Sequence, residues 1–190
     1  MNRKYWSYFL YLEEDLFNCN RYVEFSKDNE LAYSIEFARI IMATSAEIDT
    51  VSKELCFLIT NSNKADNILK YGGVICGEYP KINEVEVKIN NDEISIKPWE
   101  NWNNKISPKW WREYNDIKHD RSINYKKANM INTISSVSAL LVLLLYYYHK
   151  ANNGIYEEIN LFEAPKHLSI NSPSQDGWEG GGIYWGYIMP

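Results

Sequence analysis

Few cysteines, no nucleotide-binding glycine loop and no excess of positive charge characterise this sequence, and each absence excludes a class of protein. Its 190 residues include three cysteines, Cys19, Cys56 and Cys76, which are widely spaced and form no Cys-x-x-Cys pair. An odd number of widely spaced cysteines argues against a disulfide framework and against a zinc site of the usual spacing. We therefore expect reduced thiols in the cytosol, and neither a metal nor a cofactor.

The glycines form no loop of the kind that cradles nucleotide phosphates. Neither Gly72-Gly73 nor Gly180-Gly181-Gly182 belongs to a Gly-x-x-x-x-Gly-Lys-Ser/Thr pattern, and the motifs His-Glu-x-x-His and Gly-x-Ser-x-Gly are also missing. Each of these motifs places a phosphate cradle, a metal or a nucleophile at a fixed position. Most familiar enzyme classes are therefore unsupported.

The chain also has no excess of basic residues and no long apolar run. Its net charge is −5 and its pI about 5.3, so any contact with phosphate must come from a local basic patch. The most apolar run, residues 137–148, is shorter than the roughly 20 residues that cross a bilayer. We expect a buried core helix there, no secretory signal at the N-terminus, and no membrane contact.

What is present is the composition of an ordinary globular protein. Hydrophobic residues make up 45% and charged residues 24%, and the length suits one domain. The 15 Tyr and 7 Trp are numerous. Because buried Tyr and Trp need a polar partner, many of them are expected at the edge of the core or at an interface.

Apolar residues recur at helical spacing over most of the first 154 residues. Asp28 or Asn29 can cap the second helix, Gly72-Gly73 is expected to end the third, and Ser107-Pro108 is a typical helix start. The expected helices are 3 to about 18, 30 to about 60, a short piece at 64–71, 109 to about 122, and about 125–151.

The spacing changes to strict alternation between residues 84 and 97, which predicts a β-hairpin turning at Asn90-Asn91-Asp92. We therefore predict a mainly α domain over residues 1–154, a bundle of four to five helices with a small β-hairpin insertion. Residues 155–190 are predicted to form an irregular, aromatic and glycine-rich tail, or short strands, packed on that domain.

The densest set of reactive side chains lies between Arg112 and His119. On a helix, Asn115, Asp116 and His119 fall within about 60° of Arg112, so the four share one face. Lys118 and Arg121 point elsewhere and can reach phosphate or solvent.

This face has the groups needed for metal-independent cleavage of RNA. An imidazole can exchange a proton with the ribose 2′-hydroxyl or the leaving oxygen, and an arginine can hold the charge that grows on phosphorus oxygens. Asn115 or Asp116 can orient the imidazole. The alternative is that His119 is an ordinary hydrogen-bonded surface group.

Other candidate residues have a functional and a structural interpretation. Glu36 and Glu47 are about 16 Å apart by helix rise, so they cannot share a metal ion, but Glu47 can pair with Arg112 or Lys118. Four tryptophans precede the motif and can either stack on bases or serve as core or dimer contacts. They are Trp99, Trp102, Trp110 and Trp111.

The segment Arg112-x6-His119 resembles the Arg-x(4–6)-His motif of the HEPN superfamily. The run Tyr114-Asn115-x-x-Lys118-His119-x-Arg121, preceded by Trp111, is similar to a pattern in bacterial HEPN-like proteins, and the resemblance covers roughly residues 5–150. Further similar segments are 21–24, 33–37 and 47–49.

The resemblance implies a helical domain that pairs as a homodimer, so that both motifs line one cleft. It implies a ribonuclease of a toxin–antitoxin or anti-phage defence system, with RNA as substrate and an antitoxin as partner. His119 would be the acid/base, Arg112 the phosphate clamp and Asn115 the orienting residue, while Lys118, Arg121, Trp111 and Tyr114 would bind substrate, supported by Glu47 and Asp116.

Two features depart from the family pattern. The spacer has the maximal six residues, and Glu113 follows the arginine where nuclease members often have Asn, Asp or His. Since an acid beside a phosphate site repels substrate, a non-catalytic HEPN-like module that binds RNA, a nucleotide or a protein is the alternative. A third interpretation is a structural protein in which this face is a dimer contact.

Overall fold

The computed structural model describes residues 3–89, 94–152 and 164–170. These contain six α-helices and three strands, which confirms the mainly α class, although with more helices than the four to five predicted. The elements are α1 (Lys4–Cys19), α2 (Ile35–Thr60), α3 (Ile68–Glu78), β1 (Val87–Ile89), β2 (Ser95–Ile96), α4 (Lys109–His119), α5 (Arg121–Asn124), α6 (Met130–Ala151) and β3 (Leu168–Ile170), with 3-10 turns η1 (Lys27–Asn29), η2 (Pro80–Glu84) and η3 (Tyr125–Lys127).

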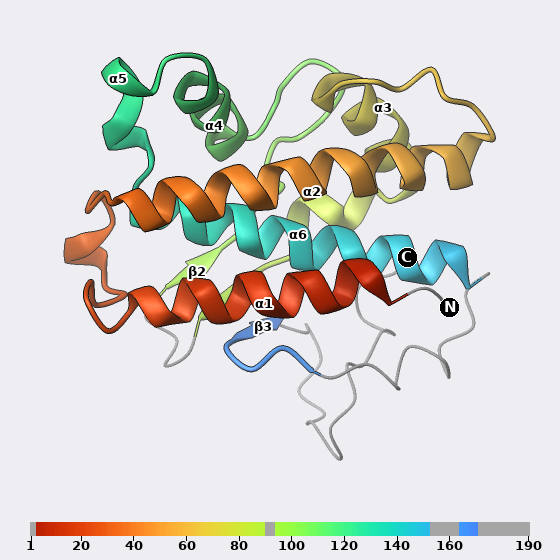
Figure 1. Cartoon of the computed structure of the whole chain (residues 1–190). Coiled ribbons are helices and arrows are strands. Elements are labelled where there is room, and N and C mark those ends of the chain that lie inside the picture. The colour runs from red at the N-terminus through yellow and green to blue at the C-terminus, as the bar shows by residue number, and fades with distance from the viewer. Residues whose placement is uncertain (1–2, 90–93, 153–163, 171–190) are drawn as a thin grey trace.

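The helices α2 and α6 form the centre of the molecule. α2 packs against α6, α1, α3 and α4, and α6 also contacts α1 and α4. Figure 1 shows α1 on one side of this pair, with α3, α4 and α5 together on the opposite side. The long helices thus form the layers on which α4 rests.

Helix α6 is the one described helix that is long and apolar enough to cross a membrane. In its most apolar stretch, however, 83% of the residues are buried within the protein. This burial is typical of the core helix of a soluble protein, as predicted from residues 137–148.

The start of α2 differs from the prediction. Asp28 and Asn29 do not cap it; Ser34 does, by accepting a hydrogen bond from the amide of Phe37 at 3.0 Å. Residues 30–34 pair instead with the start of α6 and the residues just before it, since the amide of Met130 donates to the carbonyl of Ala32 at 2.9 Å. The helix begins at Ile35 because the backbone before it is used in this pairing.

Gly72 and Gly73 do not end α3, which continues to Glu78. A Cβ atom on Gly72 would lie 2.5 Å from the backbone oxygen of Asn103. The glycine is therefore required for close approach between the helix and the Asn103 loop, not for a chain break.

The predicted hairpin is present as β1 and β2, with Val87 opposite Ile96. The C-terminal segment is not irregular throughout, because β3 pairs antiparallel with the other edge of β1 and gives the order β2-β1-β3. The buried carboxylate of Glu13 on α1 anchors this strand by accepting backbone hydrogen bonds of 2.9 to 3.1 Å from residues 166–168. The predicted tail residues 155–163 and 171–190 lie outside the described part.

Candidate functional site

The candidate site is built on α4, whose inner face is aromatic. Trp110, Trp111, Tyr114 and Ile117 are buried. The indole N–H of Trp110 donates to the carbonyl of Pro98 at 2.8 Å. These side chains attach the helix to the core and fix the direction of its other face.

Burial decides between the two interpretations of the aromatic residues. Trp99 and Trp102 are fully buried, and Trp111 and Tyr114 are 7% and 6% exposed. Their rings pack on one another. The ring centre of Trp111 lies 5.2 Å from that of Tyr114, and the ring centre of Trp110 lies 5.5 Å from that of Trp99. The rings belong to the core, so their faces are covered and do not offer a platform for bases.

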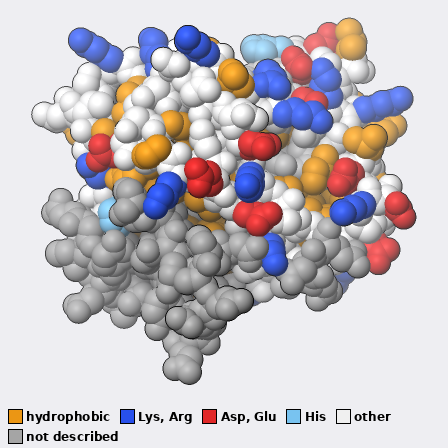
Figure 2. Space-filling view, turned by 180° about the vertical axis from the view of Figure 1, so that it is seen from behind, with side chains coloured by type: hydrophobic (Ala, Val, Ile, Leu, Met, Phe, Trp, Pro, Cys, Tyr) orange, Lys and Arg blue, Asp and Glu red, His pale blue; other side chains and the backbone are white. Residues whose placement is uncertain are grey.

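The outer face of α4 borders an open depression of about 540 Å³. Figure 2 shows Lys and Arg side chains, with carboxylates between them, along the edge of the molecule that carries α3, α4 and α5 in Figure 1. The depression is lined by Lys109, Arg112, Glu113, Asn115, Asp116 and Lys127.

Most charges in this depression are already paired. The ammonium of Lys127 lies 2.6 Å from a carboxylate oxygen of Asp116, and the ammonium of Lys109 lies 3.9 Å from one of Glu113. The guanidinium of Arg112 instead donates to the backbone carbonyl of Ser107. Among the described residues that line the depression, Arg112 is thus the cation with no carboxylate partner.

Glu113, the departure from the family pattern, is turned toward another helix. Its carboxylate accepts a hydrogen bond from the side chain of Asn132, in the first turn of α6, where Asn129 is the N-cap. The N-terminal end of a helix carries partial positive charge, so this position favours an anion. Glu113 therefore connects α4 to α6, and its charge is partly balanced there.

His119 is the last residue of α4 and its side chain is exposed. Within the described residues it has no hydrogen bond or ion pair, and it does not line the depression. His119 is seven positions after Arg112, a helix rise of about 10.5 Å. The structure thus places both residues on α4, exposed to solvent, without bringing their side chains into contact.

The remaining motif residues have separate environments. The ammonium of Lys118 lies 5.7 Å from the ring centre of Tyr114. Asn115 is half-buried in the depression and makes no hydrogen bond to His119. The predicted helix to about Ser122 is interrupted at Asp120, whose side chain accepts from the amide of Ile123, so Arg121 belongs to α5.

Glu47 does not pair with Arg112 or Lys118. Burial, and then the neighbouring charge of Glu54, raise the pKa of the Glu47 carboxyl above its ordinary value. The charged neighbour that affects the pKa of Glu47 is therefore another carboxylate on α2, and not a cation of α4. Lys127 was not among the predicted site residues, but it lines the depression and pairs with Asp116.

Across residues 3–89, 94–152 and 164–170, no three His, Cys, Asp or Glu side chains gather as a metal site. No protein-family model, curated protein or solved structure matches the chain.

Proposed function

We propose that the protein is a HEPN-like, metal-independent endoribonuclease that acts through the outer face of α4. The observation that carries the proposal is the state of Arg112, a cation in an open depression with no carboxylate partner among the described residues. On the same helix, His119 is exposed and engaged by no described residue. An available cation and an available imidazole are the two groups that this chemistry needs.

In this mechanism Arg112 binds the phosphodiester and stabilises the charge that develops on its oxygens. His119 accepts the proton of the ribose 2′-hydroxyl, whose oxygen forms a bond to phosphorus as the bond to the 5′ oxygen breaks. The 5′ oxygen leaves with a proton from a protonated His119 imidazole, and a 2′,3′-cyclic phosphate remains. Asn115 orients the reacting groups, while Lys118 and Arg121 hold neighbouring phosphates.

The separation of the two residues favours a homodimer. Residues whose backbone positions lie about 10.5 Å apart along one helix do not act readily on one phosphate, but a second copy can place its His119 opposite Arg112. The HEPN resemblance implies this arrangement, in which two motifs line one cleft.

The cellular setting follows from the same resemblance. We propose a cytosolic protein of a toxin–antitoxin or anti-phage system, held inactive by an antitoxin protein. The free thiols of Cys19, Cys56 and Cys76 agree with a reducing compartment.

One observation favours a second candidate, a non-catalytic module that binds RNA. The depression that contains Arg112 is lined by three cations and two carboxylates but not by His119. Such a site can hold a phosphate without transferring a proton. The same experiment separates the two candidates.

Purified protein is incubated with total RNA in the presence of a chelator, alongside His119→Ala and Arg112→Ala. Arg21→Ala is the matched control, because Arg21 is exposed and lies outside the depression. We expect cleavage by the parent and the control and none by the two site variants. Binding without cleavage, weakened only in Arg112→Ala, supports the binding module, and an absence of both activities contradicts both candidates.

A further inference from the structure

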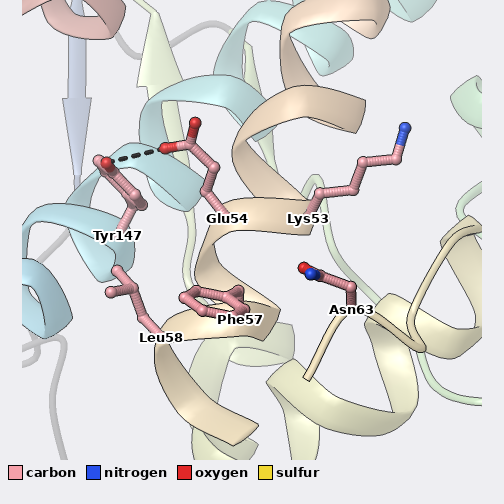
Figure 3. Close-up of a pocket in the computed structure, with 6 residues that line it drawn as sticks. All are labelled: Lys53, Glu54, Phe57, Leu58, Asn63 and Tyr147. Atoms are coloured by element: carbon pink, nitrogen blue, oxygen red, sulfur yellow. Dashed lines mark hydrogen bonds between the residues drawn. The ribbon is translucent and has the colours of Figure 1, made fainter. Parts of the chain in front are cut away.

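A second polar cavity, of about 450 Å³, lies between the C-terminal halves of α2 and α6. Its lining side chains come from two adjacent turns of α2, from the loop after α2 and from α6 (Figure 3). They are Lys53, Glu54, Phe57, Leu58, Asn63 and Tyr147. None of them belongs to the depression beside α4.

Two tyrosines fix the carboxylate of Glu54 at the wall of this cavity. The hydroxyl of Tyr5 donates to one oxygen at 2.5 Å. The hydroxyl of Tyr147 donates to the other oxygen at 3.0 Å, the bond drawn as a dashed line in Figure 3. Burial, and then the contact with Glu54, raise the pKa of both hydroxyls, so both stay protonated as donors. The carboxylate is thus preorganised and keeps further lone pairs free to accept hydrogen bonds.

No described cation neutralises this carboxylate. The ammonium of Lys53 is paired with Asp49 at 2.6 Å, and Figure 3 shows it pointing away from Glu54. Glu47 lies two turns earlier on α2, and the raised pKa of its carboxyl reflects burial together with the charge of Glu54. Negative charge therefore accumulates beside the cavity, where the tyrosine donors are neutral.

The rest of the lining is apolar or aromatic and open to solvent. Phe57 is 42% exposed and Leu58 is 40% exposed. The rings of Tyr5 and Tyr147 meet edge to face at 5.5 Å, which holds them beside Glu54. Aromatic faces attract cations, and apolar side chains beside a carboxylate suit an alkyl chain that ends in a positive charge.

We propose that this cavity binds an organic ammonium ion, with the ammonium on Glu54 and the alkyl chain over Phe57 and Leu58. The Asn63 side chain, which projects into the cavity in Figure 3, offers an additional amide oxygen. A free alkylamine and the side chain of a lysine on another protein have the same chemistry. This site does not depend on the ribonuclease proposal, and its test uses no RNA.

The probe is butylammonium chloride, titrated into the full chain by calorimetry and by NMR of the tyrosine and Phe57 resonances. 1-Butanol has the same alkyl chain without the charge and serves as the ligand control. We expect saturable binding of butylammonium and none of 1-butanol. Glu54→Gln, which removes the charge but keeps one of the two oxygens that accept from the tyrosines, should weaken binding by about tenfold or more.

Two further variants complete the test. Glu100→Gln removes one exposed negative charge elsewhere and should leave the affinity unchanged. Phe57→Ala, at a position whose side chain is 42% exposed, should weaken binding about threefold or more. If circular dichroism shows that Glu54→Gln is unfolded, the affinity of Phe57→Ala decides the test.

The proposal is overturned if butylammonium does not bind saturably. It is also overturned if butylammonium binds both Glu54→Gln and Phe57→Ala as tightly as it binds the parent protein. A parallel titration with Nα-acetyl-lysine methylamide identifies the source of the cation. Glu54-dependent binding at least as tight as that of butylammonium supports a lysine on a partner protein, and clearly weaker binding supports a free amine.

Discussion

The two faces of α4 differ in composition and in how they are held. On the inner face, buried tryptophans pack ring against ring and Trp110 donates to a backbone carbonyl. On the outer face, Arg112 and His119 are exposed and make almost no tertiary contact. Substitutions on the inner face should therefore change stability, while those on the outer face should change activity alone.

A comparison of the two polar sites extends this point. In the depression beside α4 the group without an opposite charge is a cation, Arg112, whereas in the α2–α6 cavity it is a carboxylate, Glu54. Ligands of opposite charge should therefore select between the two sites. Variants in one site should leave binding at the other unchanged.

The largest effect on stability is expected from Trp110→Ala. Removing this 4% exposed ring leaves a cavity against Trp99 and Trp111 and an unpaired carbonyl at Pro98. We expect a loss of about 3–5 kcal/mol in the free energy of unfolding, measured by urea denaturation. A loss below about 1 kcal/mol would show that the aromatic face does not support α4.

A smaller loss is expected from Gly72→Ala, for which Gly77→Ala is a matched control. The new Cβ at Gly72 meets the Asn103 oxygen at 2.5 Å, whereas one at Gly77 meets nothing within 4 Å. Since the obstacle at Gly72 is backbone, we expect a destabilisation of about 1–3 kcal/mol there and a gain of up to about 1 kcal/mol at Gly77. Equal urea midpoints for the two variants would contradict the close approach.

These glycines also show where the sequence was informative. Periodicity predicted the helix order and the hairpin because each follows from neighbouring residues. Gly72-Gly73 was interpreted as a chain break, since the reason for the glycine is a loop 31 residues later in the chain. For the same reason, the pairing of residues 30–34 with the start of α6 and the residues just before it, and the addition of β3 to β1, were not predicted.

The candidate site was predictable to a similar degree. A helical segment with Arg112 and His119 on its exposed side followed from the local pattern. The partners of its charges did not, because Glu113 is oriented by Asn132 and Asp116 by Lys127, both on later segments. The break at Asp120 was missed although Asp is favoured at N-caps, because the helical spacing of the apolar residues does not show the bond from the Ile123 amide to Asp120.

Glu113 joins the two faces, and its substitution should have an intermediate effect. Glu113→Ala removes the acceptor for Asn132 and the partner of Lys109. We expect a loss of about 1–2 kcal/mol in the free energy of unfolding, because the buried side-chain amide of Asn132 loses one of its two acceptors and keeps only the Lys127 carbonyl. Glu113→Gln should lose less free energy of unfolding, since it keeps an acceptor for Asn132. A larger loss in Glu113→Gln than in Glu113→Ala would argue against this role.

The carboxyl of Glu47, two turns before Glu54 on α2, should make the free energy of unfolding depend slightly on pH. Because its pKa is raised in the folded protein, the folded state binds this proton more tightly than the unfolded state. The charged form therefore destabilises the fold at neutral pH and costs nothing below the unfolded pKa of about 4.3. Glu47→Gln should be more stable than the parent at pH 7, by less than about 1 kcal/mol. The difference should disappear near pH 4, and urea midpoints that differ equally at both pH values would contradict this.

The smallest effects on stability are expected on the outer face of α4. Arg112→Ala and His119→Ala remove exposed side chains, so each should change the free energy of unfolding by less than about 0.5 kcal/mol. Arg112→Lys sharpens the test, because lysine keeps the charge but loses the planar fork that binds two phosphate oxygens. We expect it to retain part of the RNA binding that Arg112→Ala loses, measured at constant salt. If Arg112→Ala instead cost as much stability as Trp110→Ala, the two faces of α4 would not be separable, and Arg112 would be a structural residue whose bond to the Ser107 carbonyl holds the start of the helix.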